Sequence, residues 1–166
     1  MARGRDAGLA QALSRVLDAR LPPPLLLVLL GAAMWAVSVH VPGFMLRHPT
    51  IDAVAAALAV VGLLANGLPK LAFSRVRTTV NPLRPSNATS LVTHGLHRVS
   101  RNPMYVGHVL LLAAWALYLG HAIAALCVPL QMAWLARFQI LPEERALDAK
   151  FGVAWQAYRT RVPRWL

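Results

Sequence analysis

Side chains that can do chemistry gather in two segments of the sequence, 75–105 and 142–164. The first segment holds His94 and His97, and His108 follows shortly after it. Histidine titrates near neutral pH and can therefore give or take a proton during a reaction. We take these three histidines as candidate catalytic residues, while each of them could equally well satisfy a local hydrogen bond.

The pair Asn102-Pro103 predicts the start of a helix. Asparagine is favoured at the N-cap of a helix, and proline fits its first turn. The free N–H groups of a helix start can also hold a carboxylate or another anion. Gly107 lies four residues after Pro103, on the same helix face, where a small residue permits close helix packing or a flat ligand.

The second segment begins with two adjacent carboxylates, Glu143 and Glu144, in a chain with only six acidic residues. Carboxylates are favoured in the first turn of a helix, so both could simply be exposed residues at a helix start. Adjacent helix positions point about 100° apart, so the pair cannot form one clamp. We predict that one glutamate faces a site while the other pairs with a basic residue.

A helical pattern continues through the rest of this segment. Four large residues recur on one helix face: Leu147, Phe151, Trp155 and Tyr158. Such a face is typical of a helix that lies on a membrane.

The composition places these segments in a membrane protein. The chain has 166 residues, of which 57% are apolar and 14% are charged, and the apolar residues come in long blocks. This excludes a disordered chain, and one cysteine excludes a disulfide scaffold and a cysteine-rich metal site. No metal site is predicted. The net charge of +11 indicates contact with anionic lipid headgroups rather than with nucleic acid, because the basic residues flank apolar blocks.

We predict an all-α integral membrane protein with about four transmembrane helices and a cytoplasmic C-terminal helix. Blocks of about 20 apolar residues are long enough to cross a bilayer. The expected spans are residues 25–45, 51–69, 103–120 and 121–141, and the last two form a tight hairpin around Gly120-His121. Residues 25–166 form one domain with a tail at 142–166. Residues 1–24 are either an amphipathic interfacial helix or a polar tail.

The basic residues orient these spans. All 17 lysines and arginines except Arg47 fall in the two terminal segments and the central loop. Because positive charge favours the cytoplasmic side, both termini are expected in the cytoplasm. The heavy use of Ala, Arg, Leu and Gly suggests a bacterial source, and hence the inner membrane.

Several motifs together resemble one family of integral-membrane methyltransferases, which includes isoprenylcysteine carboxyl methyltransferase and the phospholipid N-methyltransferases. The resemblance covers about residues 78–164, and its strength lies in the combination and order of its parts. These parts are Leu91-Val92-Thr93-x-Gly95-x-x-Arg98, Arg101-Asn102-Pro103-x-Tyr105-x-Gly107, Glu143-Glu144, Phe151-Gly152, Tyr158 and Arg161-Val162-Pro163-Arg164.

The resemblance implies S-adenosylmethionine as methyl donor, bound in a pocket that faces the cytoplasm. It implies methylation of a lipophilic acceptor, such as a phospholipid amine or a small thiol, amine or carboxylate, with membrane lipids as partners. The positions that it implies for the cofactor are Thr89, Ser90, Leu91, Val92, Gly95, His97, Arg101, Asn102, Pro103, Met104, Tyr105, Gly107, Glu143 and Glu144.

Three positions depart from the family pattern. Asn102 stands where a histidine is usual, His97 where a tyrosine is usual, and Gln139 where the isoprenylcysteine enzymes have a substrate-binding arginine. Arg137 lies nearby, so we take Arg137 and Gln139 as candidate substrate-binding residues. Two other interpretations remain open: an NADPH-dependent membrane reductase of the steroid-reductase type, and a non-enzymatic membrane scaffold.

Overall fold

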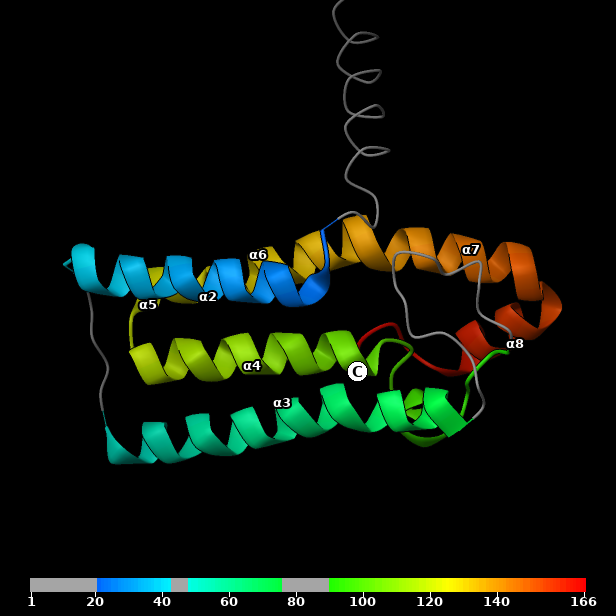
Figure 1. Cartoon of the computed structure of the whole chain (residues 1–166), viewed down its shortest axis with the longest axis horizontal. Helices are drawn as coiled ribbons and strands as arrows, with labels where there is room; N and C mark the ends of the chain where they lie inside the picture. The colour runs from blue at the N-terminus through cyan, green and yellow to red at the C-terminus, as the bar shows by residue number, and fades with distance from the viewer. Residues whose placement is uncertain (1–20, 43–47, 76–89) are drawn as a thin grey trace, which may run out of the picture.

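The computed structural model describes residues 21–42, 48–75 and 90–166, which are almost entirely helical (Figure 1). The helices long enough to shape the bundle are α2 (Pro23–His40), α3 (Pro49–Arg75), α4 (Pro103–Leu119), α6 (Cys127–Leu135), α7 (Leu141–Phe151) and α8 (Val153–Arg161). Short elements connect them: η2 (Gly95–Arg98), α5 (Ala122–Ala125) and η3 (Ala136–Ile140), which is a π-helical turn.

Helix α4 lies in the middle of the bundle, with α3 on one side and α2 and α6 on the other (Figure 1). Its residues Tyr105 and Leu112 are buried in two apolar clusters, with Leu26 and Met34 of α2. These clusters lie inside the protein, whereas α2 and α3 expose many large apolar side chains on their outer faces. Exposed apolar faces of this kind suit a helix surrounded by lipid.

The structure confirms the all-α membrane fold. Helix α2, residues 49–71 of α3 and the helix running from Ala122 to Phe151 are long and apolar enough to cross a membrane, and α4 is a shorter apolar helix. The predicted hairpin around Gly120 and His121 is also present. Gly120 ends α4 with φ of 63°, which favours glycine, and the His121 ring accepts a hydrogen bond from the backbone N–H of Ala124.

The predicted fourth span, residues 121–141, runs without a break into the predicted helical tail, because the helix continues to Phe151. The position along this helix at which the chain leaves the bilayer stays a prediction. Pro142, where the charged tail is predicted to begin, lies inside this helix. A proline inside a helix has no N–H for the carbonyl four residues earlier and its ring crowds that carbonyl. The chain meets this with the π turn η3, in which the N–H of Leu141 donates to Ala136, five residues back.

Helices α3 and α4 approach each other closely through Gly62 and Gly107. A Cβ atom added to Gly107 would lie 2.7 Å from the carbonyl oxygen of Gly62 and 2.7 Å from the backbone nitrogen of Asn66. The Asn66 side chain bridges the same helices, since its Nδ2 donates to the Met104 carbonyl at 3.3 Å while its Oδ1 accepts from Lys70. Of the two uses predicted for Gly107, the structure shows close helix packing.

The chain turns sharply at Gly152, with φ of 47°, and α8 folds back towards the start of α4 (Figure 1). The predicted apolar face is present, because Trp155, Tyr158 and Val162 form a buried cluster against which Leu147 and Phe151 pack. Its predicted contact with the membrane is wrong. These residues pack instead against one another and against Leu91, so the apolar face is used inside the protein.

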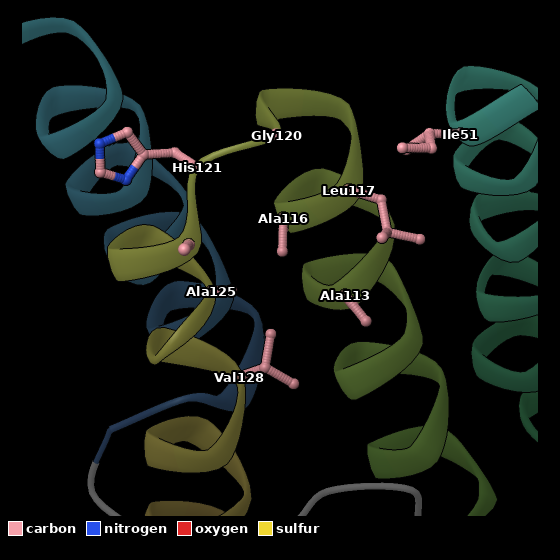
Figure 2. Close-up of a pocket in the computed structure, with 9 residues that line it drawn as sticks. Ile51, Ala113, Ala116, Leu117, Gly120, His121, Ala125 and Val128 are labelled. Atoms are coloured by element: carbon pink, nitrogen blue, oxygen red, sulfur yellow. The ribbon is translucent and has the colours of Figure 1, made fainter. Parts of the chain in front are cut away.

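A separate apolar cavity of about 410 Å³ lies at the opposite end of the bundle, beside the Gly120 turn (Figure 2). Figure 2 shows Ala113, Ala116 and Leu117 of α4 on one side of it and Val128 on the other. The His121 ring at the edge of this cavity already has a partner within the protein, because its Nε2 lies 3.1 Å from the Val41 carbonyl oxygen. This cavity is far along α4 from the residues that carried the chemistry in the sequence.

Candidate functional site

The chemistry-bearing residues meet at the end of the bundle where α4 begins, together with η2, α7, α8 and the last turns of α3 (Figure 1). This arrangement follows from the topology. The tight turn at Gly120 returns the chain along α4, so that α7 comes to lie beside the start of α4. The sharp turn at Gly152 then brings α8 and the C-terminal residues onto the segment before α4.

Glu143 contacts Tyr105 through a hydrogen bond from the Tyr105 hydroxyl to Oε1 of the carboxylate. Tyr105 is 5% exposed, and its ring is part of the apolar cluster formed with Leu26, Leu135 and Ile140. The ring centroid of His108 lies 6.3 Å away, one turn further along α4. The first turn of α7 and the first two turns of α4 thus place a carboxylate, a phenol and an imidazole in one region.

Glu144 points to a different set of partners and pairs with two arginines. Nε and Nη2 of Arg164 donate to its two carboxylate oxygens at 3.1 and 2.7 Å. Nη2 of Arg101 lies 3.2 Å from Oε1. The predicted division between the two glutamates is therefore confirmed for Glu144, which pairs with basic residues. Its hydrogen bond raises the pKa of Arg164.

Arg101 is largely buried, with its side chain 9% exposed. Its guanidinium carbon lies 5.7 Å from the centre of the Trp155 ring, within range of a cation–π interaction. Burial lowers the pKa of Arg101, and the Glu144 carboxylate opposes that effect. Within the part of the chain that the structure describes, Nε and Nη1 of Arg101 are buried and have no hydrogen-bond partner, which leaves two donors for a ligand.

The segment from His97 to Asn102 is held by the C-terminal residues. The Tyr158 hydroxyl donates to the His97 carbonyl at 2.7 Å, and the Arg101 N–H donates to the Pro163 carbonyl at 2.9 Å. Burial raises the pKa of Tyr158 to about 12, so the hydroxyl keeps its proton and remains a donor. These bonds fix the backbone of the segment that leads into α4.

Asn102 occupies the N-cap position, as predicted, but its side chain does not cap the helix. Nδ2 donates instead to the Arg164 carbonyl at 2.9 Å, while the Asn102 N–H donates to the Ser100 hydroxyl. The expectation that Asn102 caps α4 through its side chain is wrong, because the C-terminal segment offers its amide a carbonyl acceptor.

A cavity of about 400 Å³ lies between η2 and the end of α3. One wall consists of His94, Gly95, Leu96 and His97, and the other consists of Leu68, Pro69 and Leu71. Leu68 and Leu71 are about half exposed on the outer face of the bundle. The cavity therefore joins an apolar surface to two imidazoles. Burial, with a smaller contribution from His94, lowers the pKa of His97 to about 4.

The two candidate substrate-binding residues lie in the π turn. Gln139 is 1% exposed, and its Nε2 donates to the Leu21 carbonyl at 2.6 Å. The guanidinium carbon of Arg137 lies 5.3 Å from the centre of the Phe138 ring. The amide donor of Gln139 is thus used inside the protein, while a substrate role for either residue stays a prediction.

The remaining predicted cofactor residues fall into three groups. Thr89 lies outside the described residues. Leu91 packs against the Trp155 cluster, Val92 and Pro103 are buried, and the Met104 carbonyl accepts from Asn66. Ser90 has a buried hydroxyl without a partner among the described residues. Ser90 thus joins Arg101 and Glu143 among the predicted residues that offer polar atoms to a ligand.

Three contributors escaped the sequence analysis as site residues: Asn66, Trp155 and Arg164. Asn66 had a usable signal, because a polar residue inside an apolar span usually faces a partner. The sequence pattern placed Trp155 on a membrane-facing surface, and Arg164 appeared only as part of the family resemblance. Their true positions depend on the sharp turn at Gly152, whose direction no local pattern specifies.

Comparison with known proteins identifies the family. The model of the phospholipid methyltransferase family matches residues 50–154. The chain belongs to the phospholipid methyltransferase family. The match includes α3, α4 and both glutamates of α7, and it confirms the resemblance read from the motifs.

An uncharacterised protein of Haemophilus influenzae is 41% identical to this chain over 63 residues. That stretch is 38% of this chain and the whole of the Haemophilus protein. No solved structure matches the chain significantly. The family therefore supports a membrane methyltransferase.

Proposed function

We propose that the protein transfers a methyl group from S-adenosylmethionine to a lipophilic acceptor at the membrane surface. The observation that carries the proposal is the division of the two adjacent glutamates in a chain of this family. Glu144 is held by Arg101 and Arg164, whereas Glu143 faces Tyr105 at the start of α4. Among the described residues, Arg101 and Arg164 pair with Glu144 and not with Glu143, so the carboxylate of Glu143 is the one proposed to bind a ligand.

The residues at this end of the bundle fit the donor. S-adenosylmethionine carries a carboxylate, an ammonium group, ribose hydroxyls and a sulfonium centre that supplies the methyl group. The buried donors of Arg101 suit its carboxylate, and Glu143 suits its ammonium group or its hydroxyls. The Ser90 hydroxyl is a further buried polar atom for the ligand.

The cavity between η2 and α3 is the proposed acceptor site. Its α3 wall is apolar and continues into the outer surface of a helix that can cross a membrane. Its other wall carries His94 and His97. An amphiphile can lay its hydrocarbon part along Leu68 and Leu71 and bring its polar end to the imidazoles. We place this end of the bundle at the cytoplasmic face, in accordance with the positive charge around it.

An amine or thiol acceptor must lose a proton as the new bond to the methyl carbon forms. With a pKa of about 4, His97 is neutral at physiological pH but is a weak base. Efficient proton removal needs a base whose pKa lies near the working pH. His97 therefore fits a role in binding and orienting the acceptor better than a role in proton removal.

Calorimetry on detergent-purified protein tests the cofactor, with S-adenosylhomocysteine as the probe. We expect micromolar binding to the wild type and a loss of roughly tenfold or more in Glu143→Gln, because a charge-assisted hydrogen bond contributes about 1.5–3 kcal/mol. Asp148→Asn is the matched control, since Asp148 lies on the same helix and bonds only weakly to Gln156 at 3.5 Å.

The possible results separate the candidate functions. Binding of NADPH in place of S-adenosylhomocysteine would favour the reductase. Binding of neither compound by folded protein would refute the methyltransferase proposal and favour a scaffold. If S-adenosylhomocysteine binds, labelled methyl donor can then be used to screen lipid extracts for the acceptor.

A further inference from the structure

Gln139 and the π turn that contains it take no part in the proposed binding of S-adenosylmethionine, yet they lie just before Glu143 on the same helical rod. Helices α6 and α7 form one continuous rod, interrupted only by the turn of π-helix at residues 136–140 (Figure 1). A π turn accommodates one extra residue, which rotates everything after it by about 100° relative to an unbroken α-helix. The rotation of α7, and hence the direction of Glu143, depends on this turn.

Packing within the turn shows the rotation directly. Leu135 and Ile140 are both fully buried and belong to the same apolar cluster, although they are five residues apart. In an α-helix the residue one turn after Leu135 on the same face would be Gln139. The extra residue therefore places Ile140 in the core beside Leu135. The Gln139 side chain then points to an adjacent side of the helix.

On that side Gln139 makes a buried hydrogen bond to the segment that leads into α2. Its Nε2 donates at 2.6 Å to the carbonyl of Leu21, and the side chain is 1% exposed. Leu21 immediately precedes the prolines that open α2, and it packs against the same cluster as Ile140 and Tyr105. The hydrogen bond thus ties the π turn to the entrance of α2.

We propose that Gln139 is a positioning residue that holds the π turn in register and so aims Glu143 at the start of α4. Gln139 precedes Glu143 by four residues, one helical turn, and Glu143 meets Tyr105 there. If the turn relaxed, α7 would rotate, and both Glu143 and the pairing of Glu144 with its arginines would lose their alignment. The inference rests on the proposed function for its consequence in ligand binding.

The test replaces Gln139 by methionine, which keeps the length of the side chain and removes the hydrogen-bond donor. Gln131→Met is the matched control: it makes the same change on the same rod, before the π turn, at a residue that is 0% exposed. The Gln131 amide has no hydrogen-bond partner among the described residues, so its replacement removes no bond seen in the structure. Gln139→His supplies a ring N–H as an alternative donor.

Two measurements are made on each variant in detergent: hydrogen exchange of residues 141–147 and binding of S-adenosylhomocysteine. We expect faster exchange and roughly tenfold weaker binding in Gln139→Met, since a fixed carboxylate is lost from the ligand. Gln131→Met should match the wild type in both, and Gln139→His should recover part of the binding.

Each contrary outcome is informative. Equal exchange and equal binding in Gln139→Met and wild type would overturn the proposal. Equal losses in the two methionine variants would also overturn it, because the effect would then follow from any change in the core. If wild-type protein fails to bind S-adenosylhomocysteine, the proposed function is refuted, and the exchange measurement still decides whether Gln139 positions α7. If Gln139→Met does not fold, Gln139→Leu, which also removes the donor, takes its place in both measurements, with Gln131→Leu as its control.

Discussion

Replacement of Gly107 by alanine gives a direct measure of how closely α3 and α4 must pack. The added Cβ would meet the Gly62 carbonyl oxygen and the Asn66 nitrogen, each at 2.7 Å, and the Asn66 Cβ at 3.0 Å. Two of these atoms belong to the backbone of α3, so no side-chain rotation can relieve the overlap. The helices must separate until the contacts approach the usual 3.5–4.0 Å, a shift of roughly 1 Å.

Two opposing effects set the size of the change. Overpacking of a tight interface typically costs about 1–3 kcal/mol. Alanine is favoured over glycine within a helix by about 1 kcal/mol at most, which offsets only part of that cost. Separation of the helices also strains the hydrogen bond from Asn66 to Met104. We therefore expect a net destabilisation of about 1–2 kcal/mol, or about 2–8 °C in Tm for a chain of this size.

Thermal unfolding in detergent, followed by tryptophan fluorescence, measures this loss. Gly67→Ala is the matched control, because it makes the same change in α3, one residue after Asn66, where an added Cβ meets no atom within 4 Å. Its Tm should stay equal to that of the wild type or rise slightly. Equal Tm values for Gly107→Ala and Gly67→Ala would refute the close approach of α3 and α4 described here.

Two further predictions concern the charged end of the bundle. Glu144→Gln leaves Arg101 and Arg164 without their shared carboxylate and should cost about 3 kcal/mol, at the low end for a buried pair because Arg164 is partly exposed; an unchanged Tm would contradict this. His97 has a folded pKa of about 4 against an ordinary 6.5, so the unfolded chain binds more protons between these values. Its contribution to stability is therefore complete above pH 6.5 and falls with pH, by about 2 kcal/mol at pH 5. The Tm of His97→Asn should depend less on pH, and equal slopes would argue against a neutral buried His97.

Much of this fold could be predicted from the long apolar blocks of the sequence and from the turn residues between them. The lengths of the blocks gave the spans, and Gly120-His121 gave the hairpin, because these signals are local. The sequence does not show that the helix before Pro142 continues through this proline into the charged tail. Whether a proline breaks a helix or is absorbed by a π turn depends on the partners available around it, here the apolar cluster of Ile140 and the Leu21 carbonyl.

Many residues of the candidate site could be named from the sequence, but the contacts between them could not. The angle between adjacent helix positions was enough to predict that Glu143 and Glu144 serve different partners. The identity of those partners could not be predicted, because Arg164 reaches Glu144 only after the chain reverses at Gly152. For the same reason Asn102 was correctly placed at the helix start but wrongly expected to cap it.

The contacts between the C-terminal residues and the segment before α4 make these two regions one cooperative unit. Three residues of this segment form hydrogen bonds, through backbone or side chain, to residues between Tyr158 and Arg164: His97, Arg101 and Asn102. These bonds act in parallel along six residues of chain, so release of α8 would free both the η2 wall of the cavity beside α3 and the entrance of α4. It follows that the Arg164–Glu144 pair is coupled to the position of His97, although no direct bond between them is needed. The effect of Glu144→Gln should therefore extend to ligand binding in the cavity, and combining it with Tyr158→Phe should cost less than the sum of the two changes, as expected for residues of one network.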